Sequence, residues 1–162
     1  MRFIKSSMVG SIALFFSIAA FNNIIDFNSN FIYVQHVLSM DTTYNEPALM
    51  PRSITNPWLS YFIYYFIVAW EILTAILCWH GCIGLLLTIK KPIQRFNEAK
   101  IVAFWGLFLG FILYMVGFII IGGEWFSMWQ SPTWNGQMKA GLFVSLIMFI
   151  MIFLQNDDKE SQ

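Results

Sequence analysis

The sequence predicts an all-α integral membrane protein that folds as a bundle of four transmembrane helices. Of its 162 residues, 58% are hydrophobic and only 11% are charged, whereas soluble domains carry about a quarter charged residues. Four segments, at about residues 8–25, 57–89, 101–121 and 138–154, are apolar for roughly the length that crosses a bilayer core of about 30 Å. We therefore expect one transmembrane domain at residues 1–155 and a polar cytoplasmic tail at 156–162.

The first apolar segment has two interpretations. Arg2 and Lys5 before it, and the small residues Ser17 and Ala19 within it, are also typical of a cleaved signal peptide. The apolar stretch continues past that site to Ile25, however, and is longer than the usual core of a signal, about 7 to 15 residues. We expect a retained helix, with cleavage as the alternative.

The other three segments carry signals for where their helices begin and end. Asn56 followed by Pro57 is typical of an N-cap with proline at the first helical position, and Lys90 follows the end of this second segment. Because the second segment exceeds one bilayer crossing, we expect it to tilt or protrude. Gly122 and Gly123 are expected to end the third segment. The polar tail after the fourth is expected to be disordered.

The positions of Lys and Arg predict the orientation, because cytoplasmic flanks retain positive charge. Basic residues gather before the first segment and between the second and third: Arg2, Lys5, Lys90, Lys91, Arg95 and Lys100. Both termini are therefore expected in the cytoplasm. The loops on the opposite side carry residues typical of a membrane interface, namely Tyr44, Trp58, Tyr61, Trp125, Trp129 and Trp134.

The segment between the first two spans is too polar to be a further span, yet it has a helical pattern. Phe31, Val34 and Leu38 recur at near-helical spacing, and Ser29 or Asn30 is available as a cap. This pattern predicts a short amphipathic helix on the membrane surface or over the mouth of the bundle. The first extracytoplasmic loop is therefore expected to be ordered.

Four strings of residues, spread over nearly the whole chain, carry a resemblance to a known family. They are Asn22 to Phe31, Val34 to Thr43, Ala69 to Glu71 and Gly122 to Gln137. In these strings the chain resembles a bacterial family of predicted small integral membrane proteins, domain of unknown function 2165. The resemblance implies a four-span protein of the bacterial cytoplasmic membrane. It supplies no catalytic residue, and the cofactor stays unknown.

Glu71 is the leading candidate for a functional residue because it lies deep in the second segment. A charged carboxylate at the bilayer centre costs on the order of 3 kcal/mol, so we expect it to face the bundle, to be protonated or to find a partner. Ala75, Cys78 and Cys82 share its helix face, and such small residues permit close helix packing. Glu71 either handles an ion, a proton or a ligand, or fixes packing through a hydrogen bond.

Small residues also predict contact faces on the third and fourth segments. Gly106 and Gly110 form a G-x-x-x-G arrangement in the third, and Gly141 and Ser145 lie one turn apart in the fourth. Such residues let helix backbones approach closely. We favour contacts within one bundle over contacts between copies.

The loops opposite the cytoplasm hold carboxylate and imidazole groups of the kinds that bind divalent metals: Asp26, His36, Asp41, Glu46 and Glu124. Their spacing matches no metal-binding motif, so we favour solvated or hydrogen-bonded side chains and assign no metal site. Asp26 and Glu124 are expected to meet across the bundle mouth. Together with Trp125 and Gln130 they suggest a polar lid over the bundle.

Three functions from different classes follow. The preferred one is a non-catalytic accessory subunit that docks a membrane or periplasmic protein, because the chain is small and its loops are rich in tryptophan. The alternative is binding or transport of a small ligand, such as a lipid, quinone or cation, through Glu71 and the outer carboxylates. A membrane enzyme has the least support, because no nucleophile or acid/base pair is evident. The partner common to all three is the lipid bilayer; a net charge of zero argues against nucleic acid.

Overall fold

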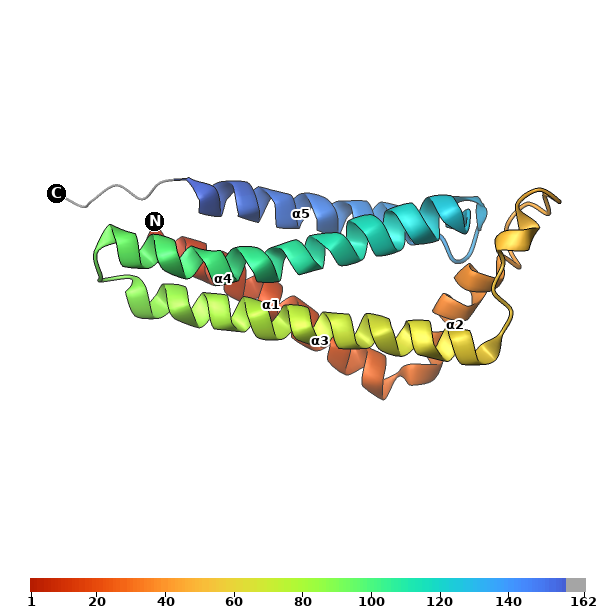
Figure 1. Cartoon of the computed structure of the whole chain (residues 1–162), viewed down its shortest axis with the longest axis horizontal. Coiled ribbons are helices and arrows are strands. Elements are labelled where there is room, and N and C mark those ends of the chain that lie inside the picture. The colour runs from red at the N-terminus through yellow and green to blue at the C-terminus, as the bar shows by residue number, and fades with distance from the viewer. Residues whose placement is uncertain (157–162) are drawn as a thin grey trace.

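The computed structural model describes residues 1–156, whose regular secondary structure is entirely helical, with no strand among them. Four long helical segments lie side by side (Figure 1): α1 (Arg2–Ile25), α3 (Pro57–Thr88), α4 (Ile93–Ile112) continuing into the π-helix η2 (Leu113–Trp125), and α5 (Gln137–Gln155). All four are long and apolar enough to cross a membrane. The predicted fold class, an all-α integral membrane protein, is confirmed. Of the tail at 156–162 that is predicted to be disordered, residues 157–162 lie outside the described residues.

The two ends of the bundle differ. The start of α1, the end of α5 and the turn between α3 and α4 lie together at one end, here called the terminal end (Figure 1). There Arg2 ties the chain start to the turn, because its Nη1 donates to the carbonyls of Ile89 (3.0 Å) and Lys91 (2.7 Å). The opposite end, called the lid end, carries α2 (Phe27–Ser39) and the short helices η1 (Met50–Arg52) and η3 (Met128–Gln130).

Helix α3 begins where its capping residues predict. The Asn56 side chain accepts a hydrogen bond from the Trp58 backbone N–H at 2.9 Å, and Pro57 occupies the first helical position. Its 32 residues span about 48 Å at 1.5 Å per residue, well beyond a hydrocarbon core of about 30 Å. The helix is therefore long enough both to cross the membrane and to reach the lid.

Glycines bring α3 and α4 into close contact. A Cβ built on Gly81 would lie 2.5 Å from the Ala103 Cα, and one on Gly106 would lie 2.7 Å from the Cys78 backbone nitrogen. A Cβ on Gly110 would lie 2.7 Å from the Phe16 ring of α1. The preference for contacts of Gly106 and Gly110 within one bundle is thus confirmed.

Gly141 and Ser145 do not form the contact within the bundle that the sequence predicts on the fourth segment. A Cβ on Gly141 would meet nothing within 4 Å, and Ser145 is exposed. Helix α5 instead packs into the core through larger residues, Val144 and Ile147, on a different side of the helix. Gly141 and Ser145 therefore face away from the core, while Ala140 is the small residue of this helix that is buried.

The helix predicted between the first two spans is present as α2, but it begins earlier than expected. Asp26, rather than Ser29 or Asn30, occupies the N-cap position, and the backbone runs from α1 into α2 with only this residue between them. Phe31 and Leu38 of α2 pack with Tyr64 of α3 in an apolar cluster at the lid end. Helix α2 thereby covers part of that end of the bundle (Figure 1).

Gly122 and Gly123 do not end the third span, which contradicts the sequence prediction. Helix η2 continues through both to Trp125, and the Phe126 N–H reaches back to the Ile121 carbonyl at 3.0 Å, an i to i+5 hydrogen bond. Both glycines are buried, and a Cβ on Gly123 would lie 2.8 Å from the Gln137 side chain. They serve close packing against the lid rather than helix termination.

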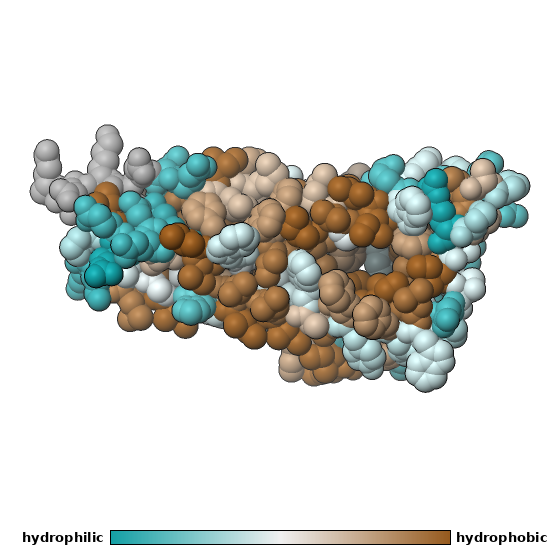
Figure 2. Space-filling model, viewed as in Figure 1, coloured by the Kyte–Doolittle hydropathy of each residue, from teal (hydrophilic) through white to brown (hydrophobic). Residues whose placement is uncertain are grey.

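The surface matches a lipid environment. Figure 2 shows a mostly apolar middle between ends where hydrophilic residues gather. Large hydrophobic side chains are exposed along the spans, among them Phe62, Leu87 and Phe149. A helix that is apolar all round is typical of a membrane span.

Candidate functional site

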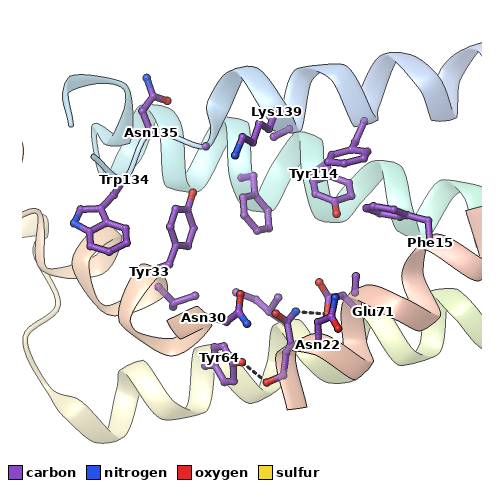
Figure 3. Close-up of a pocket in the computed structure, with 18 of the residues that line it drawn as sticks. Phe15, Asn22, Asn30, Tyr33, Tyr64, Glu71, Tyr114, Trp134, Asn135 and Lys139 are labelled. Carbon is purple, nitrogen blue, oxygen red and sulfur yellow. Dashed lines mark hydrogen bonds between the residues drawn. The ribbon is translucent and has the colours of Figure 1, made fainter. Parts of the chain in front are cut away.

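A cavity of about 630 Å³ lies between α1, α2, α3, η2 and α5, toward the lid end (Figure 3). Its size falls within the range of small-molecule sites, about 300 to 1,000 Å³. Aromatic rings make up much of the wall, which is typical of such sites. Two loops at the lid end, residues 40–56 and 126–136, are here called the lid loops. Polar side chains from all five elements and from the second lid loop also line the cavity: Asn22, Asn23, Asn30, Tyr33, Tyr64, Glu71, Tyr114, Thr133, Asn135 and Lys139.

Glu71 lies at the α3 side of this cavity, so the prediction that it faces the bundle is confirmed. Its side chain is 4% exposed, and its Oε2 accepts a hydrogen bond from the Asn23 amide of α1 at 2.7 Å. The Tyr64 hydroxyl, two turns nearer the lid, donates to the Asn23 carbonyl at 2.6 Å. Within residues 1–156 no basic side chain pairs with the carboxylate. Its one protein hydrogen-bond partner in that range is therefore a neutral amide.

Aromatic rings close the cavity toward the terminal end. The Phe15 and Phe143 rings lie 4.6 Å apart, and the Tyr114 and Phe143 rings 5.0 Å apart. Figure 3 shows Phe15 and Tyr114 on the same side of the cavity, from α1 and η2. The packed rings make this side of the cavity wall apolar.

Tyr33 of α2 stands in the lid half of the cavity. Its hydroxyl donates to the Met128 sulfur at 3.0 Å. Burial raises the pKa of this hydroxyl to about 12, and a hydrogen bond from the Gly136 backbone only partly opposes that shift. Tyr33 is thus a neutral donor at physiological pH. A Cβ at position 136 would overlap its hydroxyl oxygen, so a larger residue there would displace the Tyr33 side chain.

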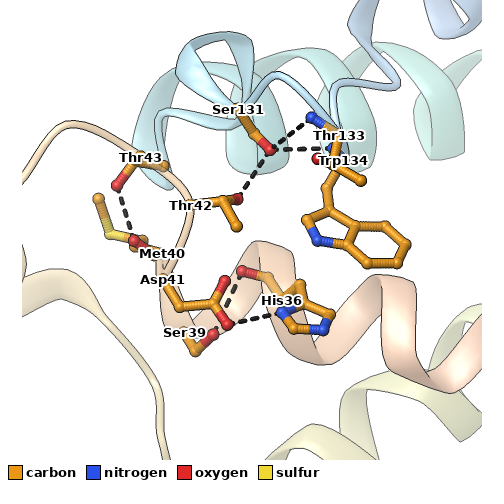
Figure 4. Close-up of polar contacts among 9 residues, drawn as sticks. All are labelled: His36, Ser39, Met40, Asp41, Thr42, Thr43, Ser131, Thr133 and Trp134. Atoms are coloured by element: carbon orange, nitrogen blue, oxygen red, sulfur yellow. Dashed lines mark hydrogen bonds and ion pairs between the residues drawn. The ribbon is translucent and has the colours of Figure 1, made fainter.

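The lid loops are tied to each other over the cavity (Figure 4). His36 Nδ1 lies 2.6 Å from Asp41 Oδ2, and the His36 ring stacks on Trp134 with centroids 4.6 Å apart. Thr42 Oγ1 and Ser131 Oγ share a hydrogen bond at 2.7 Å, and Ser131 Oγ also accepts from the Trp134 N–H. These contacts hold Trp134, which lines the cavity, in one position.

The remaining candidates on the lid are spread out. Asp26 is exposed at the junction of α1 and α2, while Glu124 accepts a hydrogen bond from the Gln137 amide at 3.1 Å. Trp125 lies under the Arg52 guanidinium, 4.7 Å from its carbon, and Gln130 accepts from the Tyr44 N–H at 2.9 Å. The prediction that Asp26 and Glu124 meet is therefore wrong, because Glu124 contacts Gln137 instead.

Of the five carboxylate and imidazole residues considered for a metal, His36 and Asp41 alone come together in residues 1–156. No group of three His, Cys, Asp or Glu side chains suited to a metal ion occurs in this described part of the chain. Glu46 is exposed in the loop before η1. The spacing of these residues along the chain does not bring their side chains to one point.

Sequence reasoning missed Asn23, Tyr114 and Lys139 as members of the site with Glu71. A signal was present for the first two, because polar residues within spans usually face the bundle interior. Lys139 gave no such signal, since it stands at the start of α5 and is exposed on one side. Only the packing of α5 against η2 places it on the cavity wall.

Comparison with curated proteins gave no match, and comparison with solved structures gave none either. The family model described as "Predicted small integral membrane protein (DUF2165)" matches residues 1–157. The match includes all four long helices, both lid loops and every residue that lines the cavity. The chain therefore belongs to the DUF2165 family of small integral membrane proteins, whose function is unknown.

Proposed function

We propose that this protein binds a small lipid-soluble molecule in the cavity beside Glu71, and that this molecule donates a hydrogen bond to the carboxylate. The observation that carries the proposal is a 4% exposed carboxylate on the wall of a cavity of about 630 Å³. An ionised carboxylate within a span costs on the order of 3 kcal/mol. The single Asn23 amide contributes about 1.5 to 3 kcal/mol, as a hydrogen bond to a charged group does, and it leaves the other carboxylate oxygen, Oε1, without a protein partner in residues 1–156.

The lining indicates the chemical class of the ligand. Phe15, Phe118 and Phe143 offer flat apolar contacts, and Asn22 and Asn30 add amide groups to the wall of the same cavity. A hydroxyl or amine on an apolar body satisfies both kinds of contact. Quinols, hydroxylated lipids and lipid amines all have this character. This proposal takes up the ligand-binding alternative from the sequence, centred on Glu71 and without the outer carboxylates.

The accessory role is a second proposal, and a separate surface favours it. Tyr44, Trp125 and Trp129 are exposed at the lid end, and Arg52 stacks on Trp125. Tryptophan, tyrosine and arginine are the residues most enriched at the energetic centres of protein interfaces. We propose this cluster as the docking surface for a membrane or periplasmic protein.

We further propose that residues 1–155 act as one transmembrane domain in a bacterial inner membrane, with the lid end outside the cytoplasm. The basic residues support this orientation, since Lys90, Lys91 and Arg95 all lie in or beside the turn at the terminal end. Under this arrangement the lid loops face the periplasm. The cavity then lies in the outer half of the membrane.

Substitution of Glu71 tests ligand binding. The wild-type protein and the Glu71→Gln variant are purified in mild detergent from their own membranes, and retained small molecules are identified by native mass spectrometry. Glutamine keeps the shape and can still accept from Asn23, so folding should persist, while a charge-assisted hydrogen bond to the ligand is lost. We expect the variant to lose a molecule that the wild type retains in stoichiometric amount.

Glu98→Gln is the matched control, because Glu98 is exposed and pairs only with Arg95 in the described structure. It should retain the same molecule as the wild type. Retention of an identical set of molecules by Glu71→Gln would contradict the proposal. A stoichiometric protein, retained by all three and lost when Trp125 and Trp129 are replaced, would support the accessory role instead.

A further inference from the structure

A second, smaller hollow lies beside the cavity. It has a volume of about 170 Å³ and opens between α2, α3 and η2. Its lining is almost wholly apolar and includes Val37, Ile63, Leu113, Ile121 and Phe126. Figure 2 shows a hollow in the apolar face between α3 and η2. A molecule in this hollow would therefore meet hydrocarbon side chains rather than polar groups.

The two spaces share one wall. Tyr33, Val34, Ile67 and Phe118 line both the cavity and the apolar hollow. Ile67 lies one helical turn from Glu71 on α3. The apolar hollow thus begins one turn nearer the lid than the Glu71 carboxylate. The four shared side chains form the wall between the hollow and the cavity.

Gly117 helps to make this hollow. A Cβ added there would meet only the Leu113 side chain, at 3.8 Å, which is an ordinary contact. Packing therefore does not require glycine at this position, unlike Gly81, where a Cβ would lie 2.5 Å from backbone. Glycine in a helix costs about 1 kcal/mol relative to alanine. Because Gly117 has no side chain, it leaves open apolar space beside η2.

The helix that supplies Gly117 and Phe118 is itself unusual. Helix η2 is a π-helix of 13 residues, whereas π-helical geometry mostly occurs as single turns, frequently at functional sites. Its residues line both spaces: Tyr114 faces the cavity, Gly117 faces the hollow, and Phe118 lies between them. One irregular element therefore shapes the polar and the apolar compartment together.

We propose that the ligand is a single-chain amphiphile, with its polar end on Glu71 and its aliphatic chain in the apolar hollow, past the side chain of Phe118. This inference rests on the proposed function and adds the chain to it. The shared partition and the position of Ile67 place the start of the hollow next to the polar anchor. The ligand class is thus a phenol, quinol, alcohol or amine that carries one alkyl or isoprenoid chain.

The test compares the binding of two phenols, one with a long alkyl chain and one without. The probes are 4-decylphenol and 4-methylphenol, and binding to protein in lipid nanodiscs is measured by equilibrium dialysis, with uptake by empty nanodiscs subtracted. Because burial of each methylene favours binding, the wild type should bind 4-decylphenol at least about tenfold more tightly than 4-methylphenol. Gly117→Leu fills the hollow and should abolish that preference, leaving 4-methylphenol binding unchanged.

Gly141→Leu is the matched control, because it adds the same side chain to a glycine with nothing within 4 Å. It should behave as the wild type. Ile63→Phe narrows the hollow from the α3 side and serves as a second variant if Gly117→Leu does not fold. An unchanged chain preference in a folded Gly117→Leu or Ile63→Phe protein would overturn the inference.

The same measurements separate this inference from the proposed function. Glu71→Gln should weaken binding of both phenols. If it does so while Gly117→Leu leaves the chain preference intact, the site at Glu71 stands and the chain position is wrong. If the wild type binds neither phenol above the empty-nanodisc level, both proposals are refuted.

Discussion

The hydrogen bond between Asn23 and Glu71 provides a quantitative test of how the bundle holds its buried carboxylate. Asn23→Leu removes the amide that lies 2.7 Å from Glu71 Oε2, yet keeps the backbone carbonyl that Tyr64 contacts. Hydrogen bonds to charged groups contribute about 1.5 to 3 kcal/mol, and a buried group left unpaired costs its full desolvation. We therefore expect the free energy of unfolding to fall by about 2 kcal/mol.

The double variant Asn23→Leu with Glu71→Leu distinguishes a lost hydrogen bond from a poorly packed leucine. Replacing both partners with apolar groups is nearly neutral in general, and here it also removes a carboxylate that costs on the order of 3 kcal/mol within a span. The double variant no longer contains the unpaired buried carboxylate. It should therefore be at least about 2 kcal/mol more stable than Asn23→Leu alone.

The assay is reversible unfolding in mixed micelles by sodium dodecyl sulfate, followed by far-ultraviolet circular dichroism. Asn28→Leu is the matched control, because Asn28 is exposed on α2 and surface changes usually stay within about 0.5 kcal/mol. A double variant as unstable as Asn23→Leu would refute the reasoning, because the loss would then come from the leucine at position 23 and not from the unpaired carboxylate.

Two further predictions concern packing and orientation. Gly81→Ala should destabilise the bundle by about 1 to 3 kcal/mol through overpacking against Ala103, whereas Gly141→Ala should not destabilise it; equal effects in the same unfolding assay would refute the close α3 to α4 contact. A cysteine introduced by Thr133→Cys should react with an impermeant thiol reagent in intact cells, and one introduced by Gln94→Cys should not. Labelling in the reverse pattern would overturn the proposed orientation.

Local signals predicted the parts of the fold that depend on local chemistry. The start of α3 follows from Asn56 and Pro57, and the inward position of Glu71 follows from the cost of a carboxylate in hydrocarbon. The prediction that Gly122 and Gly123 end the third span is wrong, because glycine favours helix ends but also permits close packing. Here the contact with Gln137 explains Gly123, and that contact depends on how the lid loop folds back.

The cavity itself could not be predicted from one helix at a time. Its polar wall joins Asn23 of α1, Glu71 of α3 and Lys139 of α5, which are far apart in the sequence. Helical periodicity shows which residues share a face, but not which neighbouring helix that face meets. The hydrogen bond between Thr42 and Ser131 could not be predicted either, since both residues lie in loops without a repeating pattern.

The glycine contacts between α3 and α4 bear on how the chain assembles in the membrane. Gly81 and Gly106 bring the two backbones together, and only the short turn at residues 89–92 separates the helices. In the two-stage view of membrane protein folding, spans insert first and then associate through packing of small residues. We expect this hairpin to associate first, as a template on which α1 and then α5 dock. On that order, the cavity beside Glu71 takes shape only in the last step of biogenesis.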